Sequence, residues 1–188
     1  MKIPPLLAHT AVLLIVATLL AACGNQAETG VAPVEISQDS SCALDGMLLA
    51  DYPGPKAQIH YDGQPEPEFF CDTTEMFAIY LKPEQARKVR AVFVQDLDKT
   101  RWDAPQGAWI DARTAYYVVG SGKRGAMGPT IPSFGSEAGA RKFAEAQGGQ
   151  VHPFAAITPD MARLDGGALH LGHGVGRGLG LVAHREGQ

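Results

Sequence analysis

Two sulfur-bearing side chains, Cys42 and Met47, lie five residues apart in the stretch "CALDGM". The residues between them include the carboxylate of Asp45 and a glycine, so a short turn can bring both sulfurs to one face of a loop. A third soft donor, Met127, lies in the Gly-rich stretch "SGKRGAMGPTIPSF". Core methionines normally occupy periodic helices or strands, so Met127 is predicted to be exposed on a loop.

One thiolate and two thioethers form a soft ligand set of low charge, which selects Cu(I) over Zn(II) and over hard cations. A zinc site would need four Cys and His ligands at a spacing that this sequence lacks. The sequence therefore offers a candidate copper site formed by Cys42, Met47 and Met127.

A disulfide between Cys42 and Cys71 is the alternative, because two thiols outside the cytoplasm usually pair. Cys71 could instead be a small buried core residue, a copper ligand, or a thiol activated by a helix N-terminus. The sequence has neither a Gly-x-Ser-x-Gly nucleophile motif nor a Gly-rich phosphate-binding loop, so a binding protein is favoured over an enzyme.

The first 22 residues are predicted to be a lipoprotein signal peptide. An apolar run from Ala11 to Ala22 is too short to span a bilayer and ends directly before Cys23. Cys23 is therefore the expected lipidated first residue of the mature protein. Gly24 follows it in place of the aspartate that retains lipoproteins in the inner membrane. We expect anchoring at the periplasmic face of a bacterial membrane, with sorting to the outer membrane.

Composition divides the remaining chain into three parts. Residues 23–41 are small and polar and predict a flexible tether, while the Gly- and His-containing residues 162–188 predict a disordered tail. A net charge of −4 without a basic cluster argues against nucleic acid as a partner.

The segment between tether and tail shows a β-β-α-β pattern twice, over residues 42–99 and 100–161. The first copy has strands at 57–61, 68–71 and 89–97, and a helix for which Asp72 is the N-cap and Glu75 completes a capping box. The second copy has one long strand at 108–120, extended segments at 130–134 and 150–157, and a helix that begins after Ser136. The predicted fold class is α+β, with two tandem ββαβ units packed together.

The sequence resembles the NosL family, periplasmic lipoproteins tied to maturation of nitrous oxide reductase. The stretches "CALDGM", "DYPGPKAQI", "FFCDTTEMFA", "AWIDARTAYYVV", "AMG", "PSF" and "ARKFAEAQGGQVHPF" carry the resemblance in this order, over residues 42–157. It implies two ββαβ units and a Cu(I) metallochaperone that delivers copper for the clusters of the reductase. The implied partner is nitrous oxide reductase or its membrane-associated maturation complex.

The resemblance places the family's Cys and Met on Cys42 and Met47, and its downstream Met-Gly on Met127-Gly128. Many members have a second cysteine in the motif Cys-x-x-Cys-Gly-Met, where this chain has Asp45. Asp45 is then a ligand, a hydrogen-bond acceptor that orients the loop, or a turn cap. The alternative function is a periplasmic thiol-disulfide protein that uses Cys42 and Cys71.

Overall fold

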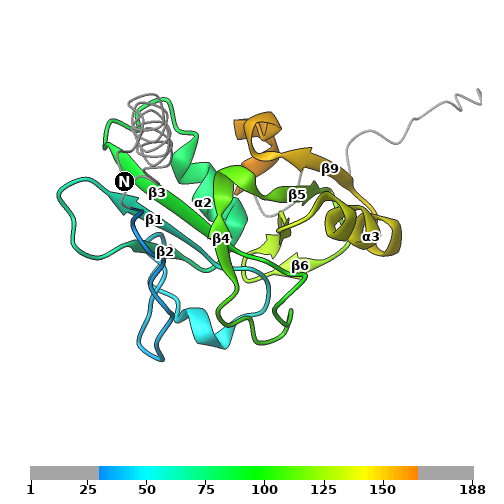
Figure 1. Ribbon diagram of the computed structural model, residues 1–188, viewed down its shortest axis with the longest axis horizontal. Coiled ribbons are helices and arrows are strands. Elements are labelled where there is room, and N and C mark those ends of the chain that lie inside the picture. Colours follow the sequence, from blue (N-terminus) through cyan, green and yellow to red (C-terminus); the bar gives the residue numbers. More distant parts are fainter. Residues whose placement is uncertain (1–29, 165–188) are drawn as a thin grey trace, which may run out of the picture. The chain divides into compact units, whose positions relative to one another are not determined.

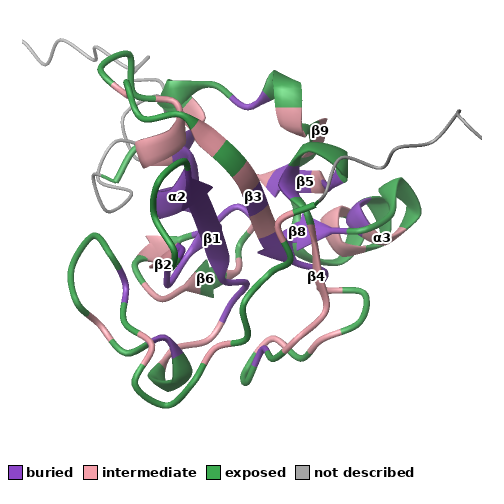
Figure 2. Ribbon diagram, turned by 60° about the vertical axis from the view of Figure 1, so that its left-hand side comes forward, coloured by how far each residue is buried: buried purple, intermediate pink, exposed green. Residues whose placement is uncertain are grey.

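The computed structural model describes residues 30–164 and has a four-stranded antiparallel sheet in its first half (Figure 1). The strands are β1 (Ala57–Tyr61), β2 (Glu68–Phe70), β3 (Val89–Gln95) and β4 (Trp109–Asp111), in the order β2-β1-β3-β4. Strand β1 is buried along its whole length, because it is central in the sheet and both its faces are covered (Figure 2). The site described below lies at the β2 edge of this sheet.

The second half forms a three-stranded antiparallel sheet in the order β8-β5-β9. It contains β5 (Tyr116–Val119), β8 (Ser133–Phe134) and β9 (Gln150–Pro153), with helix α3 (Glu137–Gln147) between the last two strands. Strand β5, the first strand of the second pattern, lies between β8 and β9. In the first pattern β1 likewise lies between β2 and β3. Both β-β-α-β patterns are therefore present, and the predicted α+β class is confirmed.

Shorter elements precede, join and follow the strands of the two sheets. A small hairpin consists of β6 (Arg124–Gly125) and β7 (Gly128–Pro129). Residues 30–164 also contain four 3₁₀ turns, η2 (Leu49–Asp51), η3 (Ala112–Thr114), η4 (Phe154–Ala156) and η5 (Pro159–Ala162). Within the described residues, no helix combines the length and the apolar character that crossing a membrane requires.

The prediction of one long strand over residues 108–120 was wrong. Asp111 caps η3 by accepting a hydrogen bond from the backbone N–H of Arg113, and this turn separates β4 from β5. Strand β4 then pairs with β3, while β5 pairs with β8 and β9. Both β4 and β5 carry apolar side chains that pack against the core, so the apolar pattern continues across the turn. The sequence periodicity therefore does not reveal that the strand is interrupted.

Helix α2 (Thr73–Tyr80) connects the two sheets through a shared core. Asp72 is its N-cap, as predicted, and accepts a hydrogen bond from the backbone N–H of Thr74. Phe77 is fully buried and meets Tyr117 of β5 edge-on, with ring centroids 4.9 Å apart. The predicted capping box is wrong, because the Glu75 carboxylate turns to the sulfurs of Cys42 and Cys71.

The two halves are also joined by hydrogen bonds at the start of α2. Thr130 Oγ1 donates to Asp72 Oδ1 at 2.8 Å, and Thr73 Oγ1 donates to the carbonyl of Ile131. The β6–β7 hairpin comes so close that a Cβ added to Gly125 would lie 2.0 Å from Asp72 Oδ2. The glycine is needed here for space, and this contact fixes where the hairpin lies.

The contacts of the folded part extend slightly beyond the predicted boundaries at both ends. Val34 exchanges two hydrogen bonds of 2.9 Å with the side-chain amide of Gln58, and Ile36 packs beside the cysteines. The end of the predicted tether 23–41 is therefore part of the fold. At the other end, Ala162 is buried in the main core. Cys23 and residues 165–188 lie outside the described residues.

Replacing Gly125 by alanine is expected to lower the free energy of unfolding by about 1–3 kcal/mol, the usual effect of overpacking. The added methyl group would push the hairpin away from Asp72. Gly122→Ala is the matched control, since its Cβ would meet only the Gln147 carbonyl at an ordinary 3.5 Å. Urea unfolding measures both variants, and equal midpoints would contradict the steric argument.

Replacing Asp72 by asparagine is expected to change how stability depends on pH. Burial raises the pKa of Asp72 from 3.8 to about 6, so the folded state loses stability as pH rises through this range. Asparagine keeps the acceptor oxygen without the charge. We expect a gain on the order of 1–3 kcal/mol at pH 8, from about 1.4 kcal/mol per pKa unit, and little difference at pH 4. Parallel stability–pH curves for the two proteins would contradict this assignment.

Candidate metal centre

The loop that carries Cys42 is closed by its own backbone. The N–H of Cys42 donates to the carbonyl of Met47 at 2.8 Å, and the N–H of Gly46 donates to the carbonyl of Cys42 at 2.9 Å. Gly46 has a φ of 77°, in the left-handed region that favours glycine. Ser41 and Leu48 form a bridge at the base of the loop. The sequence correctly predicted a tight turn here.

This loop lies along the edge of β2, which brings it to the second cysteine. Cys42 forms a parallel bridge with Phe69, and the N–H of Ala43 donates to the carbonyl of Phe69 at 2.7 Å. Cys71 follows β2 directly and precedes the N-cap of α2. Both cysteines are free thiols and both are buried, with Cys42 only 3% exposed.

Four donor side chains meet at this place: Cys42, Asp45, Cys71 and Glu75. One donor atom from each residue lies within 4.8 Å of all the others. Oε2 of Glu75 is 3.2 Å from each thiol sulfur, and its buried Oε1 has no hydrogen-bond partner. Asp45 is the exposed member, and its Oδ1 accepts the N–H of Met47 at 3.0 Å. The cluster thus has a buried part, formed by Cys42, Cys71 and Glu75, which we call the base. Its exposed edge, which includes Asp45, we call the rim.

The two thiols have opposite pKa shifts. The pKa of Cys42 is lowered to about 6, chiefly by its interaction with the side chain of Cys71, and the N–H of Leu44, which donates to its sulfur, adds to this. The same interaction between the two side chains, together with burial, raises the pKa of Cys71. Ionisation is therefore favoured at Cys42 over Cys71. Burial also raises the pKa of Glu75, to about 7.

The β6–β7 hairpin places Met127 near this cluster. Ala126 and Met127 form the tip of the hairpin, and Ala126 packs against the group formed by Cys42, Leu49 and Cys71. Met127 itself is 46% exposed, as the Gly-rich sequence predicts, although the short strands around it were not expected. Both loops that carry candidate thioethers therefore border the cysteine pair.

Sequence reasoning missed Glu75 as a neighbour of the thiols and left the place of Cys71 open. One signal was present, because Cys71 and Glu75 are four residues apart at a helix start, and this spacing puts side chains on one face. The proximity of Cys42 to Cys71 has no such signal, since it depends on pairing between the loop and β2.

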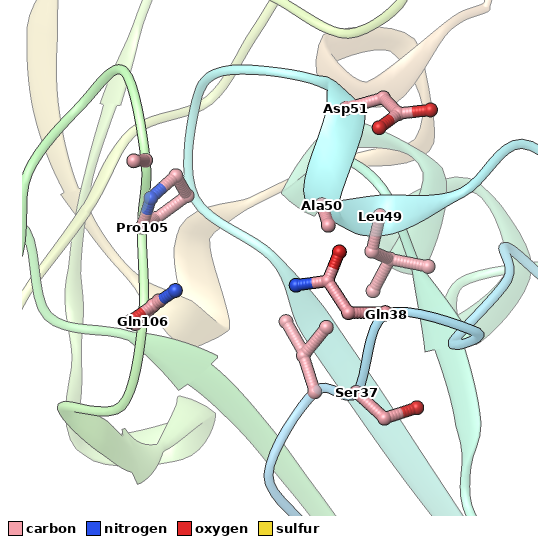
Figure 3. A pocket seen from close by; sticks show the side chains of 9 residues that line it. Ser37, Gln38, Leu49, Ala50, Asp51, Pro105 and Gln106 are labelled. Atoms are coloured by element: carbon pink, nitrogen blue, oxygen red, sulfur yellow. The ribbon is translucent and has the colours of Figure 1, made fainter.

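A hollow beside the cluster offers different chemistry (Figure 3). It is lined by Ile36, Ser37, Gln38, Leu49, Ala50, Asp51, Ala104, Pro105 and Gln106. Leu49 lines it and also belongs to the buried group that contains Cys42 and Cys71, so the hollow borders this group. The lining contains no sulfur and no imidazole, so a soft metal ion would bind on the cysteine side.

Known proteins match the chain over nearly all of the described part. The NosL family model matches residues 33–162. The copper-binding lipoprotein NosL of Stutzerimonas stutzeri is 34% identical over 171 residues, which cover 87% of this chain and 88% of that protein. The copper-binding lipoprotein NosL of Achromobacter cycloclastes is 38% identical over 147 residues, or 76% of each chain.

A solved structure agrees in fold. The crystal structure of the copper chaperone NosL from Shewanella denitrificans superposes with a TM-score of 0.64 at 37% identity. The match covers 68% of this chain and 96% of that one. With its sequence and its fold both matched, this chain belongs to the NosL family.

Proposed function

We propose that the protein binds one Cu(I) ion and delivers it for assembly of the copper centres of nitrous oxide reductase. The observation that carries the proposal is the buried pair of sulfurs, Cys42 and Cys71, within 4.8 Å of the Glu75 carboxylate. Thiolate and thioether donors favour Cu(I) among the metals of the cell. The relatives support this reading, since they are named for copper binding and for copper chaperoning.

Cys42 is the principal ligand in this proposal, because it is the thiol whose pKa is lowered and whose thiolate is therefore favoured. The thioethers of Met47 and Met127 complete a soft set from the two bordering loops, with Asp45 at the rim. Cys71 supports the Cys42 thiolate through its hydrogen bond. Glu75 lies beneath both sulfurs and limits how far they can move.

In this proposal the copper ion can be delivered because the donors at the rim are exposed while those of the base are buried. Asp45 and Met127 are exposed, so an incoming donor from a partner can displace them one at a time. The partner is nitrous oxide reductase or its membrane-associated maturation complex. The protein acts at the periplasmic face of a bacterial membrane, anchored by lipid on Cys23, and Gly24 favours the outer membrane. The function is binding and transfer of an ion, not catalysis.

The same two thiols favour a second candidate function, a periplasmic thiol-disulfide protein. Cys42 and Cys71 are free and adjacent, and the lowered pKa of Cys42 suits nucleophilic attack on a disulfide. This function needs both thiols and is indifferent to Met47 and Met127. The ligand variants below therefore separate the two candidates.

An anaerobic Cu(I) titration of residues 24–188 against a competing chelator tests the site. We expect one tight equivalent, weakened about a hundredfold by Cys42→Ser and about tenfold by Met127→Leu, with each tenfold worth about 1.4 kcal/mol. Cys71→Ser keeps a hydrogen-bond donor and is expected to cost less than about tenfold, because such supporting groups matter less than ligands.

Met161→Leu is the matched control for the methionine change, because Met161 packs against the main core. Binding that survives Met127→Leu but fails with Cys71→Ser would mean that Cys71 is the ligand and Met127 is not. Absence of stoichiometric binding in the unaltered protein would contradict the copper proposal and favour the thiol-disulfide function.

The pH dependence of Cu(I) affinity gives a second test. A proton competes with the ion for Cys42 only below the pKa of this thiol, which is about 6. We expect affinity to change little between pH 7 and 8 and to fall about tenfold per pH unit well below pH 6. Affinity that falls steadily from pH 9 to pH 7 would show an ordinary thiol pKa and contradict the assignment of the thiolate.

A further inference from the structure

The hollow beside the cysteines has a single charged side chain in its lining, that of Asp51. This side chain is exposed, and its carboxylate makes neither a hydrogen bond nor an ion pair with any other residue between 30 and 164. Figure 3 shows it at the edge of the hollow, while Leu49 and Pro105 add apolar surface to the lining. An apolar wall with an unpaired carboxylate at its edge suits a long side chain with a cationic head.

The part of the chain that forms most of this lining is acidic. Residues 30–55 contain no lysine or arginine and four exposed carboxylates, those of Glu35, Asp39, Asp45 and Asp51. The loop that forms the opposite wall carries Arg101 and Asp103, whose charges offset each other. Lys123 and Arg124 lie at the β6–β7 hairpin, and neither lines the hollow. The hollow therefore attracts a positively charged group.

The hollow and the donor cluster share one loop, residues 37–51. The N–H of Leu49 donates to the carbonyl of Ser40 at 2.9 Å, and Ser41 pairs with Leu48, so the two arms of this loop are held together. Leu49 contributes to the hollow and to the buried group around Cys42. A molecule seated in the hollow therefore lies beside the loop that carries the principal copper ligand.

Apolar side chains are exposed around the same donors. Five large apolar side chains are exposed among residues 30–164, and three of them, Leu44, Leu48 and Met127, lie on the Cys42 loop or at the hairpin tip. Apolar groups bordered by charged ones are typical of protein–protein interfaces. A bound ion passes to another protein by ligand exchange only when that protein touches the rim, so this surface must be covered during transfer.

We propose that the hollow receives a lysine or arginine side chain of the protein that accepts the copper ion, with its cationic head at Asp51 and its stem against the apolar lining. This inference rests on the proposed delivery function and adds the chemistry by which the acceptor is recognised. An anionic lipid surface is a poor occupant, because the carboxylates around the hollow repel it. The seated side chain holds the acceptor's own donor atoms close to the rim.

Two variants of the soluble chain, residues 24–188, test the charge and the shape of the hollow separately. Asp51→Asn removes the charge at nearly the same size, and Ala104→Phe fills the hollow without changing any charge. Glu145→Gln and Ala146→Phe are the matched controls, because both residues are exposed on α3, which packs on the second sheet.

Each variant is loaded with Cu(I) and mixed anaerobically with copper-free nitrous oxide reductase, and separately with the purified maturation complex. The rate of copper transfer is compared with the rate of transfer to a small chelator. Affinity for Cu(I) is measured by chelator competition, and the oligomeric state by sedimentation.

We expect both hollow variants to slow transfer to the protein acceptor about three- to tenfold, and both controls to change it less than about twofold. Affinity for Cu(I) and transfer to the chelator stay unchanged, since neither residue touches the donors. Raising the salt concentration from about 0.05 to about 0.5 M reduces the effect of Asp51→Asn but not that of Ala104→Phe, because salt screens only the charge.

Equal transfer rates in the hollow variants and the controls would overturn the inference. So would a matching loss of Cu(I) affinity, which would place the effect in the metal site, or a dimer of the unaltered chain that Asp51→Asn and Ala104→Phe dissociate, which would assign the hollow to a second copy. Failure of the unaltered protein to bind Cu(I) would instead contradict the proposed function. Binding without transfer to either acceptor would contradict the proposed delivery, and the inference with it.

Discussion

The relative positions of the residues in the candidate site depend on the contacts of the buried Asp72 carboxylate. It caps α2 directly after Cys71, and it accepts the hydroxyl of Thr130, just beyond the hairpin that carries Met127. The helix that presents Cys71 and Glu75 is thereby fixed to the loop with the distant thioether. The backbone at Gly125 packs directly against the Asp72 carboxylate, with no space for a side chain. This close contact fixes the position of the β6–β7 hairpin relative to α2.

This arrangement concentrates ionisable groups where water is excluded. Cys71, Asp72, Glu75 and Lys56 are all essentially inaccessible, and the pKa values of both carboxyl groups are raised by burial. Groups of this kind oppose folding, so proteins keep them mainly where function requires them. The shared core around Phe77 and Tyr117 supplies the apolar burial that offsets this cost.

Much of the fold, and part of the site, could be predicted because the signals were local. The Cys42–Met47 turn and the Ser136 cap each depend on residues within a few positions. Glu75 was misassigned because its spacing fits a capping box and equally fits a partner for Cys71. The contact between Cys42 and Cys71 was left open, since only the edge of β2 brings them together. Such long-range pairing leaves no pattern in a single sequence.

In the proposed copper site, the contrast between the buried base and the exposed rim accounts for both the holding and the release of the ion. The base is held by the contacts of 3.2 Å between Glu75 Oε2 and each of the two sulfurs, and by the hydrogen bond that Lys56 donates to the carbonyl of Cys71, so it need not move on transfer. The rim donors lie on a tight loop and on a hairpin tip, where exchange with solvent or a partner is easy. In this proposal the interaction with Cys71 still favours the Cys42 thiolate after the ion leaves, so the empty site stays ready for the next ion.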